Sequence, residues 1–441
     1  MDRAPLLHRM TAAGRGAWRT YAPESLRRSA QPLVRRILER RVEAALRSQG
    51  AEASPGPLVV SGLLAESKGV SEAARLSLNA FRLAGLHPIS HDLRPMLDRG
   101  LTTGVGLPAD QAGGVWFLHV NAPEAVQALG RLDPVSWRGR YRIGYWAYEL
   151  PRVPAEWVRA SAAFHEIWAP SSFVVDALRS SGVETPVRLM PHPVALGAPP
   201  AAPERAGFEI PGYAFAVLTL ADLRSSAARK NLLGAISIYM QAFPAPSTAD
   251  PPACLIVKVR EDKAYPAFLA QARHAARGRA DIRFLTGDLS SGDMHRLIAS
   301  CSLVLSPHRA EGFGLSLAEA LLAGVPILAT GWSGNVDFMA GLPELTIDYS
   351  LVPVRDAYGV YRARRQKWAE PDMQNAVAKL RVLAASPDLR ARLAAKGRGM
   401  IKALSAPWSR EALLAMPFGS LIASAGSEPA VSPVAAAGPS R

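Results

Sequence analysis

The sequence predicts an α/β protein with two doubly wound parallel-sheet domains that face each other across a central cleft. Apolar runs typical of buried strands alternate with stretches of helical periodicity, first over residues 57–194 and again over 214–330. Such alternation is typical of parallel sheets covered by helices on both faces. The segment 195–207 between the two runs, ALGAPPAAPERAG, is rich in Pro and Ala and lacks apolar periodicity, as expected of an interdomain linker.

The first run, residues 56–196, is expected to form one Rossmann-like domain on one side of the cleft. Its strand-like segments are PLVVSGLL (57–64), VWFLHV (115–120), YRIGYWAY (141–148) and VRLMPHPV (187–194). Helical periodicity over 69–86 ends at a run containing glycine, as helices commonly do. Ligands of doubly wound domains bind at the carboxyl ends of the strands, so the cleft is the expected site.

The second run, residues 208–382, is expected to form a second doubly wound domain on the other side of the cleft. Its predicted strands are 214–220, 254–259, 282–287, 303–307 and 326–330, and its predicted helices are 231–243, 265–276 and 315–324. Residues 374–418 are mostly helical in pattern, and the helices of 383–420 are expected to return to the first domain. The small and polar segment 425–441 is expected to be a disordered tail.

Positive charge is concentrated at the beginning of the chain. The formal net charge is +14, and residues 1–50 hold eleven arginines, no lysine and four acidic residues, a net charge of +7. Within the extension 1–55, Leu33, Ile37 and Val42 lie among arginines as in a basic amphipathic helix. Two interpretations are open: the helix contacts anionic lipid headgroups or an acidic partner, or it packs on the body of the protein. Nucleic acid is not expected, because no interleaved aromatic and basic residues accompany the charge.

The sequence predicts neither export nor a membrane span. No stretch approaches the roughly 18 apolar residues of a transmembrane helix, and MDRAPLLHRM is interrupted by charge too early for a secretory signal. Cys254 and Cys301 each lie inside an apolar run, as expected of reduced core residues rather than of a disulfide or a metal site. We therefore expect a cytoplasmic protein, with a peripheral position on the inner membrane face as the option that the basic extension adds.

The most informative stretch is SPHRAEGFGLSLAEALLAGVPILATGWSGNVDF, residues 306–338. It begins at the end of a predicted strand and forms a loop before the predicted helix 315–324. Gly312 and Gly314 allow close approach to the backbone, and N–H groups at a helix start bind phosphate. Glu311 and Glu319 are about 12 Å apart at helical rise, which suits one carboxylate at the sugar and one at the ribose of a nucleotide sugar.

This stretch resembles the signature of the retaining glycosyltransferases of family four, which have the GT-B fold. The signature stands here as Glu311-Gly312-Phe313-Gly314 followed by Glu319, and then by Ala323-Gly324-Val325-Pro326. The resemblance implies that Glu311 contacts the donor sugar at the reaction centre and that Glu319 holds the ribose hydroxyls. The other donor-binding residues expected in this stretch are Gly312, Phe313, Gly314, Leu315 and His308, which follows Pro307.

A second cluster lies in DLRSSAARKN, residues 222–231, near the carboxyl end of the predicted strand 214–220. Fixed cations there can neutralise the charge that builds on a departing nucleoside diphosphate. The family places an Arg/Lys phosphate clamp at this position, which implies that Lys230 contacts the leaving group. Arg229 and Arg224 both fit the second position of the clamp.

The first domain offers further candidates. Gly69 follows the first predicted strand, where the family has a Gly-rich loop near the donor phosphates; a plain helix start is the alternative. His119 and Asn121 end the predicted strand 115–120, and the resemblance implies a donor-sugar contact for His119, with a hydrogen-bonded core histidine as the alternative. Asn121 and Glu149 are expected on the acceptor side.

Four segments resemble a subgroup of bacterial polysaccharide and O-antigen mannosyltransferase-like proteins: 144–157, 166–174, 333–338 and 368–372. With the signature, the resemblance covers residues 57–405, and it implies that 208–382 is the nucleotide-sugar donor-binding domain and 56–196 the acceptor-side domain. It implies a retaining hexosyltransferase that uses GDP-mannose, or alternatively a UDP-hexose, and acts on a saccharide or glycolipid in cell-surface polysaccharide synthesis. Because the chain has no Asp-x-Asp motif and has basic residues near the phosphates, we expect neither a cofactor nor a metal.

Three other functions share parts of this pattern. A nucleotide-sugar epimerase has the same fold, and a non-catalytic scaffold could bind a nucleotide sugar without turnover. A dinucleotide-dependent oxidoreductase would require Gly-x-Gly-x-x-Gly after a strand and an acidic residue about twenty positions later, a combination that the sequence lacks.

Overall fold

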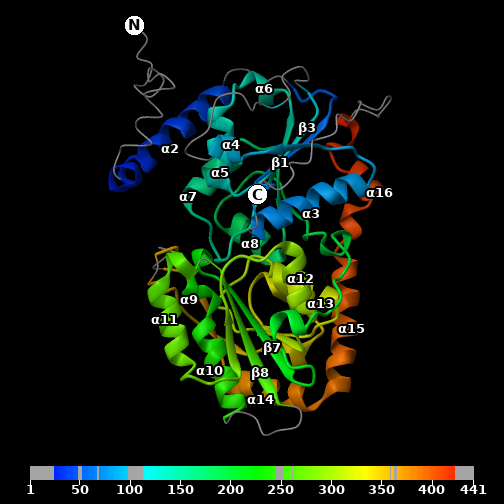
Figure 1. Ribbon diagram of the computed structural model, residues 1–441. Helices are drawn as coiled ribbons and strands as arrows, with labels where there is room; N and C mark the ends of the chain where they lie inside the picture. The colour runs from blue at the N-terminus through cyan, green and yellow to red at the C-terminus, as the bar shows by residue number, and fades with distance from the viewer. Residues whose placement is uncertain are drawn as a thin grey trace, which may run out of the picture.

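The computed structural model shows two α/β domains, one above the other in Figure 1. It describes residues 24–47, 52–66, 69–97, 107, 113–244, 252–260, 262–357, 359–361 and 365–422, and of residues 24–32, 95 and 262 only the backbone. The first part of the basic extension and the predicted tail 425–441 lie outside the described residues.

The first domain is built on a six-stranded parallel sheet with the strand order β2-β1-β3-β4-β5-β6. Its strands are β1 (Leu58–Gly62), β2 (Ile89–Asp92), β3 (Val115–His119), β4 (Tyr141–Tyr145), β5 (Glu166–Ala169) and β6 (Val187–Leu189). Its helices are α3 (Gly69–Leu83), α4 (Arg94–Leu97), α5 (Ala122–Arg131), α6 (Val135–Arg138), α7 (Ala155–Ser161) and α8 (Ser172–Ser180). The central strands β1 and β3 are buried along their whole length, which is typical of a sheet covered on both faces.

The second domain repeats this architecture with the strand order β12-β11-β10-β7-β8-β9. Its strands are β7 (Phe215–Asp222), β8 (Ala253–Arg260), β9 (Ile282–Leu285), β10 (Leu303–Ser306), β11 (Ile327–Thr330) and β12 (Thr346–Ile347). Its helices are α9 (Ala227–Lys230), α10 (Leu232–Ala242), α11 (Pro266–Ala275), α12 (Ser291–Ala299), α13 (Leu315–Ala323) and α14 (Met373–Ala385). Two doubly wound parallel sheets confirm the predicted fold class.

Short 3-10 helices connect these elements. They are η2 (Val194–Leu196), η3 (Ala206–Phe208), η4 (Leu223–Ser225), η5 (Asp262–Ala264), η6 (Gly334–Phe338), η7 (Pro343–Leu345), η8 (Ala406–Trp408) and η9 (Gly419–Leu421). Two of them, η2 and η3, lie at the ends of the predicted linker 195–207, where the chain passes from the first domain to the second.

Two predicted strands end earlier than the sequence suggested. The strand predicted over 141–148 stops at Tyr145 because the N–H of Ala147 donates to Asn121 Oδ1 at 2.9 Å and leaves the sheet ladder. The strand predicted over 187–194 stops at Leu189, since Pro191 and Pro193 have no N–H for a ladder. Strands β2, β5 and β12 were not predicted.

A two-stranded antiparallel hairpin is a further element that the sequence did not predict. Its strands are β13 (Tyr349–Pro353) and β14 (Lys367–Pro371), with Tyr349 opposite Pro371 and Pro353 opposite Lys367. It follows β12 and forms a sheet of its own beside the second domain.

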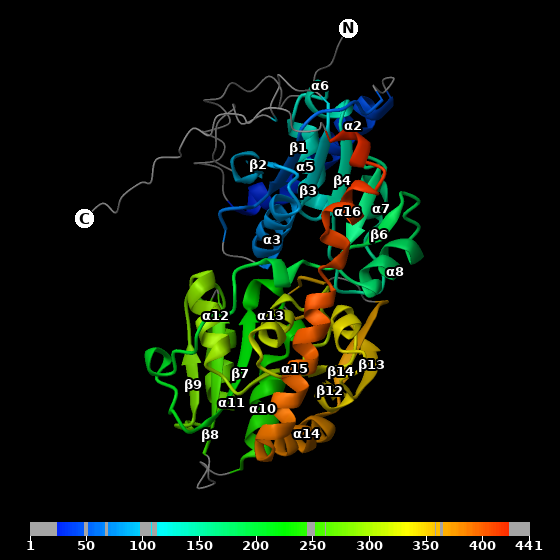
Figure 2. The same cartoon turned by 90° about the vertical axis from the view of Figure 1, so that its right-hand side faces the viewer.

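The C-terminal helices connect the second domain back to the first. Helix α15 (Pro387–Ala403) runs along the second domain towards the first, and α16 (Arg410–Leu414) lies on the first domain (Figure 2). Between them Trp408, 1% exposed, packs 5.4 Å from the ring of Phe81 and 5.6 Å from that of Trp168. Its indole N–H donates to the carbonyl oxygen of Pro191 at 2.7 Å. The core of the first domain is therefore completed by the last part of the described chain.

The basic extension contributes helix α2 (Glu24–Arg47), which lies along the first domain (Figure 1). Leu38, Val42 and Ala45 are buried, and a Cβ on Gly130 of α5 would meet Leu38 at 2.9 Å. Arg35 lies 3.5 Å from Glu156 across the same contact. For this half of the helix, packing on the body is the interpretation that the contacts support, while the arginines of the opposite face are exposed. Among the residues that the structure describes, no helix is long and apolar enough to cross a membrane.

Candidate active site

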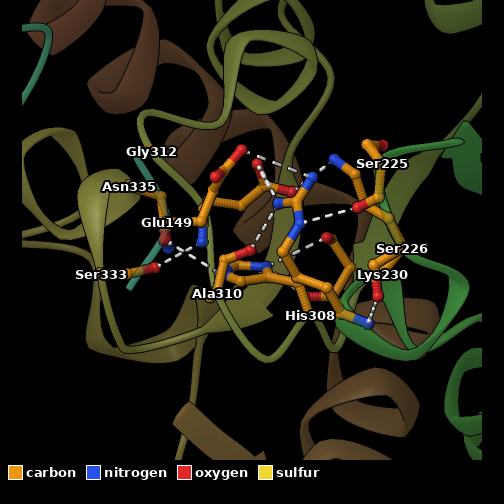
Figure 3. A network of polar contacts seen from close by, with 12 residues as sticks. Glu149, Ser225, Ser226, Lys230, His308, Ala310, Gly312, Ser333 and Asn335 are labelled. Carbon is orange, nitrogen blue, oxygen red and sulfur yellow. Dashed lines mark hydrogen bonds and ion pairs between the residues drawn. The ribbon is translucent and has the colours of Figure 1, made fainter. Parts of the chain in front are cut away.

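The loop between β10 and α13 is fixed by the segment that follows β11 (Figure 3). The N–H of Glu311 donates to Ser333 Oγ at 2.7 Å, and the N–H of Gly334 donates to the carbonyl oxygen of Glu311 at 2.9 Å. A Cβ on Gly334 would lie 2.1 Å from the carbonyl oxygen of Gly312, so only glycine allows this approach. The two halves of the 306–338 stretch therefore form one interlocked unit.

The end of this loop prepares the start of helix α13. Gly314 has a φ of +89°, a conformation that side chains disfavour, and stands immediately before the first helical residue, Leu315. The first N–H groups of an α-helix have no partner within the helix and favour negative charge. Phe313, 4% exposed, packs 5.2 Å from the ring of Phe338 in the second domain and 4.8 Å from the ring of His192 in the first, so it contributes packing between the two domains.

Glu311 lies at the centre of a cluster of charges. Its Oε1 is 2.5 Å from Lys230 Nζ, and its Oε2 is 3.1 Å from Arg229 Nη1. The carboxylate is almost buried, which by itself would raise its pKa, but Lys230 and Arg229 outweigh burial and hold the pKa of Glu311 well below its usual range. Glu311 is therefore an ionised carboxylate with a cation at each oxygen.

Arg229 and Lys230 differ in how far the protein encloses their side chains. The guanidinium of Arg229 donates to the carbonyl oxygens of Ala310 at 2.7 Å and Ser225 at 3.0 Å, and the residue is 2% exposed. Burial alone would lower the pKa of Arg229, but neighbouring acidic groups, Glu311 foremost, raise it. The side chain of Lys230 is 18% exposed and is therefore less enclosed than Arg229; neither residue lines the cavity beside Glu319. Arg224, the other candidate for the clamp, lies exposed on η4.

Glu319 lies on α13 beside a cavity open to solvent, with about 440 Å³ of unfilled space. The cavity lies between α3 of the first domain and α12 and α13 of the second, and its lining includes Glu72, Leu76, Val194, His295, Glu319 and Leu322. Glu319 Oε1 is 3.7 Å from His295 Nε2, and burial raises the pKa of Glu319 despite that partner.

Comparison with known proteins identifies the family. A family model described as "Family 4 Glycosyltransferase in conflict systems" matches residues 173–403, which is more than half of the chain. The chain belongs to this family. A search of curated proteins finds no significant match.

Solved structures of low sequence identity share the fold of this family 4 glycosyltransferase. Sucrose-phosphate synthase from Thermosynechococcus elongatus is similar with a TM-score of 0.58 at 14% identity, over 81% of this chain and 96% of that one. An E. coli structure described as trehalose-6-phosphate bound with UDP-2-fluoro glucose is similar with a TM-score of 0.55 at 12% identity, over 83% and 99%. The Anabaena protein HepE in complex with UDP and glucose is similar with a TM-score of 0.52 at 12% identity, over 83% and 98%. The likeness supports the GT-B fold.

Two histidines of this family 4 glycosyltransferase that the sequence placed on the donor side are buried. His119, 2% exposed, has its Nδ1 3.1 Å from Ser77 Oγ and stacks on Tyr145 at 4.2 Å. Burial lowers the pKa of His119 well below its ordinary value, as in the core-histidine alternative. His308 is fully buried, with its Nε2 3.0 Å from Asn335 Oδ1, and so supports the Glu311 loop from behind.

The remaining first-domain candidates have different surroundings. Gly69 is the first residue of α3, and a Cβ on it would meet no protein atom within 4 Å, which agrees with a plain helix start and equally with a glycine that approaches a bound phosphate. Asn121 is occupied by the N–H of Ala147, so it orients the chain that leads to Glu149. Glu149 does reach the cluster: its Oε1 lies 3.9 Å from Arg229 Nη2.

Sequence reasoning missed several residues that complete the site. Ser171 Oγ of the first domain donates to the carbonyl oxygen of Gly312 at 2.7 Å, and Ser172 donates its N–H to Asp337 at 2.7 Å, so both domains contribute to the loop. Both serines lie in the segment 166–174, which resembles mannosyltransferase-like proteins, but no sequence signal paired them with Gly312 or Asp337. Within the described residues, no group of three or more His, Cys, Asp or Glu side chains is arranged to hold a metal.

Proposed function

We propose that this family 4 glycosyltransferase transfers a hexose, with retention of the anomeric configuration, from a nucleoside-diphosphate sugar to a saccharide or glycolipid acceptor. The observation that carries the proposal is the cluster of Glu311 with Lys230 and Arg229 at the start of α13. A partly exposed ammonium and a helix N-terminus at one point of a cleft suit a departing diphosphate, which carries growing negative charge.

The pairing of Glu311 supports a mechanism without a protein nucleophile. A carboxylate with a cation at each oxygen and a strongly lowered pKa is a weak base and a weak nucleophile. In the proposed step the bond from the anomeric carbon to the phosphate oxygen breaks, and the acceptor oxygen bonds to the same face of the sugar. The acceptor proton passes to the leaving phosphate oxygen. Glu311 orients the sugar, Glu319 holds the ribose, and Lys230 stabilises the nucleoside diphosphate that leaves.

No cofactor or divalent ion is part of this proposal. Lys230 supplies positive charge where a metal would otherwise neutralise the diphosphate, and Arg229 keeps the neighbouring carboxylate in place. Transfer measured in EDTA should therefore equal transfer measured with Mg²⁺ or Mn²⁺.

Mannose from GDP-mannose is the donor we propose, with a UDP-hexose as the second candidate. The four segments that resemble mannosyltransferase-like proteins support the first. The UDP–glucose complex of HepE and the structure bound with UDP-2-fluoro glucose support the second by analogy of fold. The same resemblance supports an acceptor that is an intermediate of cell-surface polysaccharide synthesis.

A peripheral position on an anionic membrane face is also part of the proposal. The exposed arginines of α2, which are Arg36, Arg40, Arg41 and Arg47, support it, because such residues are attracted to anionic headgroups. Vesicle sedimentation with and without anionic lipid tests it, and equal binding to both would refute it.

Nucleotide binding is the first test of the transferase proposal. Melting temperatures with GDP, UDP, ADP and dTDP should show a rise of several degrees for one nucleotide, since saturation at 100 times Kd adds about 2.7 kcal/mol. Glu319→Ala should remove the rise. No rise with any nucleotide would refute the proposal, including the scaffold alternative that binds a nucleotide sugar.

Product analysis then separates transfer from its alternatives. Incubation with the matching sugar donor and NMR of the product should show the anomeric configuration of the donor. Lys230→Ala should abolish transfer, whereas Lys402→Ala, an exposed lysine of α15, should not. An inverted product would refute retention, and a donor converted to its epimer without an acceptor would favour the epimerase alternative.

A further inference from the structure

The β13–β14 hairpin joins the two domains at the cleft. The side-chain amide of Gln366 accepts from the N–H of Arg152 at 2.8 Å and donates to the carbonyl oxygen of the same residue at 2.9 Å. Gln366 thus satisfies both backbone groups of one first-domain residue, as a neighbouring strand would. These two hydrogen bonds fix the position of the hairpin relative to the loop that carries Glu149.

The other side of the hairpin is attached to the Glu311 loop. Arg309 donates to both carboxylate oxygens of Glu370 on β14, at 2.7 and 2.8 Å, and its guanidinium lies 5.8 Å from the centre of the Trp368 ring. The N–H of Ala369 donates to the carbonyl oxygen of Arg309 at 2.9 Å. A bidentate pair together with a backbone bond allows little relative movement, so the hairpin and the Glu311 loop form one rigid unit.

An apolar cluster fills the space between these attachments. Leu150 of the first domain is fully buried against Trp368 and Val354 of the hairpin, which are 2% and 8% exposed. Tyr148 and Tyr361 pack at its edge, with their rings 6.3 Å apart. The cluster covers one side of the loop 148–152, which carries Glu149, and keeps water away from that side.

Tyr361 carries the hairpin's contact to Glu149. Its hydroxyl donates to Glu149 Oε2 at 2.8 Å, while Oε1 of the same carboxylate faces Arg229 at 3.9 Å. Burial and Glu149 raise the pKa of Tyr361 well above its ordinary value, so the phenol remains a donor. The side chain of Glu149 is 26% exposed and is held from both ends of its carboxylate.

We connect Glu149 with the saccharide acceptor because of its position relative to Glu311. Glu149 belongs to the first domain, whereas Glu311, Lys230 and Arg229 belong to the second. One guanidinium, that of Arg229, spans the carboxylates of Glu149 and Glu311. A hydroxyl bound to Glu149 therefore lies close to a sugar bound to Glu311, on the opposite wall of the cleft.

We propose that Tyr361 is a positioning residue of the acceptor site, which orients the Glu149 carboxylate to accept a hydrogen bond from a hydroxyl of a neutral saccharide. The proposal rests on the proposed function and deepens it. The negative charge of Glu149 disfavours an anionic acceptor group, because like charges repel. The hairpin thus carries part of the acceptor specificity.

Tyr361→Phe removes only the hydroxyl, and Tyr349→Phe, a 42% exposed tyrosine of the same hairpin, is the matched control. Steady-state rates are measured with the donor and the neutral saccharide acceptor, each varied in turn. Tyr361→Phe should raise the acceptor KM about tenfold, the effect of losing about 1.4 kcal/mol of binding, with the donor KM unchanged. Tyr349→Phe should change neither. An acceptor KM within twofold of wild type, or an equal rise in the donor KM, would overturn the proposal.

A double-variant experiment tests whether Tyr361 acts through Glu149. In the Glu149→Ala background, Tyr361→Phe should have no further effect on the acceptor KM, because the residue it orients is absent. Multiplicative effects of the two substitutions would overturn the positioning role. If nucleotides bind wild type and the Tyr361 variants behave like the control, only this inference fails. If no nucleotide raises the melting temperature of wild type, the proposed function fails and this inference with it.

Discussion

Glu311→Gln keeps the shape of the side chain at the centre of the cluster and removes its charge. Lys230 and Arg229 then lose their shared counter-charge, and Arg229 is 2% exposed with its nearest remaining carboxylate at 3.9 Å. Breaking a buried ion pair costs about 3–5 kcal/mol, and we take the lower end because the Glu311 and Lys230 side chains are 11% and 18% exposed. A loss of about 3 kcal/mol lowers the melting temperature of a domain of this size by about 6–12 °C.

The pH dependence of this loss has a defined sign. The folded-state pKa of Glu311 lies well below its ordinary value of 4.5, so its ionised form contributes stability that is fully present above pH 4.5. That contribution is lost as the pH falls through the lower, folded-state value. The gap in melting temperature between wild type and Glu311→Gln should therefore stay constant from pH 8 to pH 5 and narrow below pH 4.5.

Differential scanning fluorimetry across this pH range measures the gap directly. Glu344→Gln, an exposed carboxylate of the same domain, controls for the general effect of removing one negative charge. A gap smaller than about 2 °C at pH 7 would refute the argument from burial, since such a shift corresponds to less than about 1 kcal/mol. A gap that widens on acidification would refute the assignment of the lowered pKa.

Three further predictions concern other parts of the molecule. Trp408→Ala should destabilise the first domain by about 3–5 kcal/mol and expose the last helices to limited proteolysis; resistance equal to wild type would contradict the packing argument. Gly334→Ala should displace the Glu311 loop, because its Cβ would lie 2.1 Å from the carbonyl oxygen of Gly312, and should reduce transfer about a hundredfold, as a misplacement of about 1 Å can, whereas Gly69→Ala, whose Cβ meets no protein atom within 4 Å, should leave the melting temperature unchanged. His295→Gln should lower the melting temperature by about 1–2 °C at pH 6, as expected of a pair worth about 0.5 kcal/mol, and by less at pH 9. The carboxylate partner of His295 raises its pKa above 6.5, so the contribution is present below pH 6.5 and lost as the pH rises through the raised value; a gap that grows with pH would contradict it.

The fold was predictable because its strands are long apolar runs of the kind that a covered parallel sheet requires. The failures have local causes. Strand β5 begins with the charged Glu166 and is followed by Pro170, so its apolar run is only three residues long. Four of the five residues of strand β13 are exposed, so neither face of the strand is buried. Its sequence therefore lacks the alternation of apolar and polar residues that marks a half-buried strand.

The candidate site was predictable where it is contiguous in sequence. Glu311, Gly314 and Glu319 belong to one strand–loop–helix segment, and Lys230 precedes a helix at a strand end. The contact of Tyr361 with Glu149 joins residues 212 positions apart, through a hairpin that itself had no signal. Arg229 and Arg224 were equivalent candidates in the sequence, because the difference that the structure shows, Arg229 buried and Arg224 exposed, follows from tertiary packing.

The place of Trp408 in the first domain has a consequence for how the protein is made. Strand β6 is synthesised more than two hundred residues before Trp408, which corresponds to a delay of about 10–45 s at common elongation rates. During that interval the aromatic surface around Phe81 and Trp168 has no cover from Trp408. The first domain to be synthesised is thus the last to be finished, and nascent chains stalled before residue 408 should be the ones that chaperones retain.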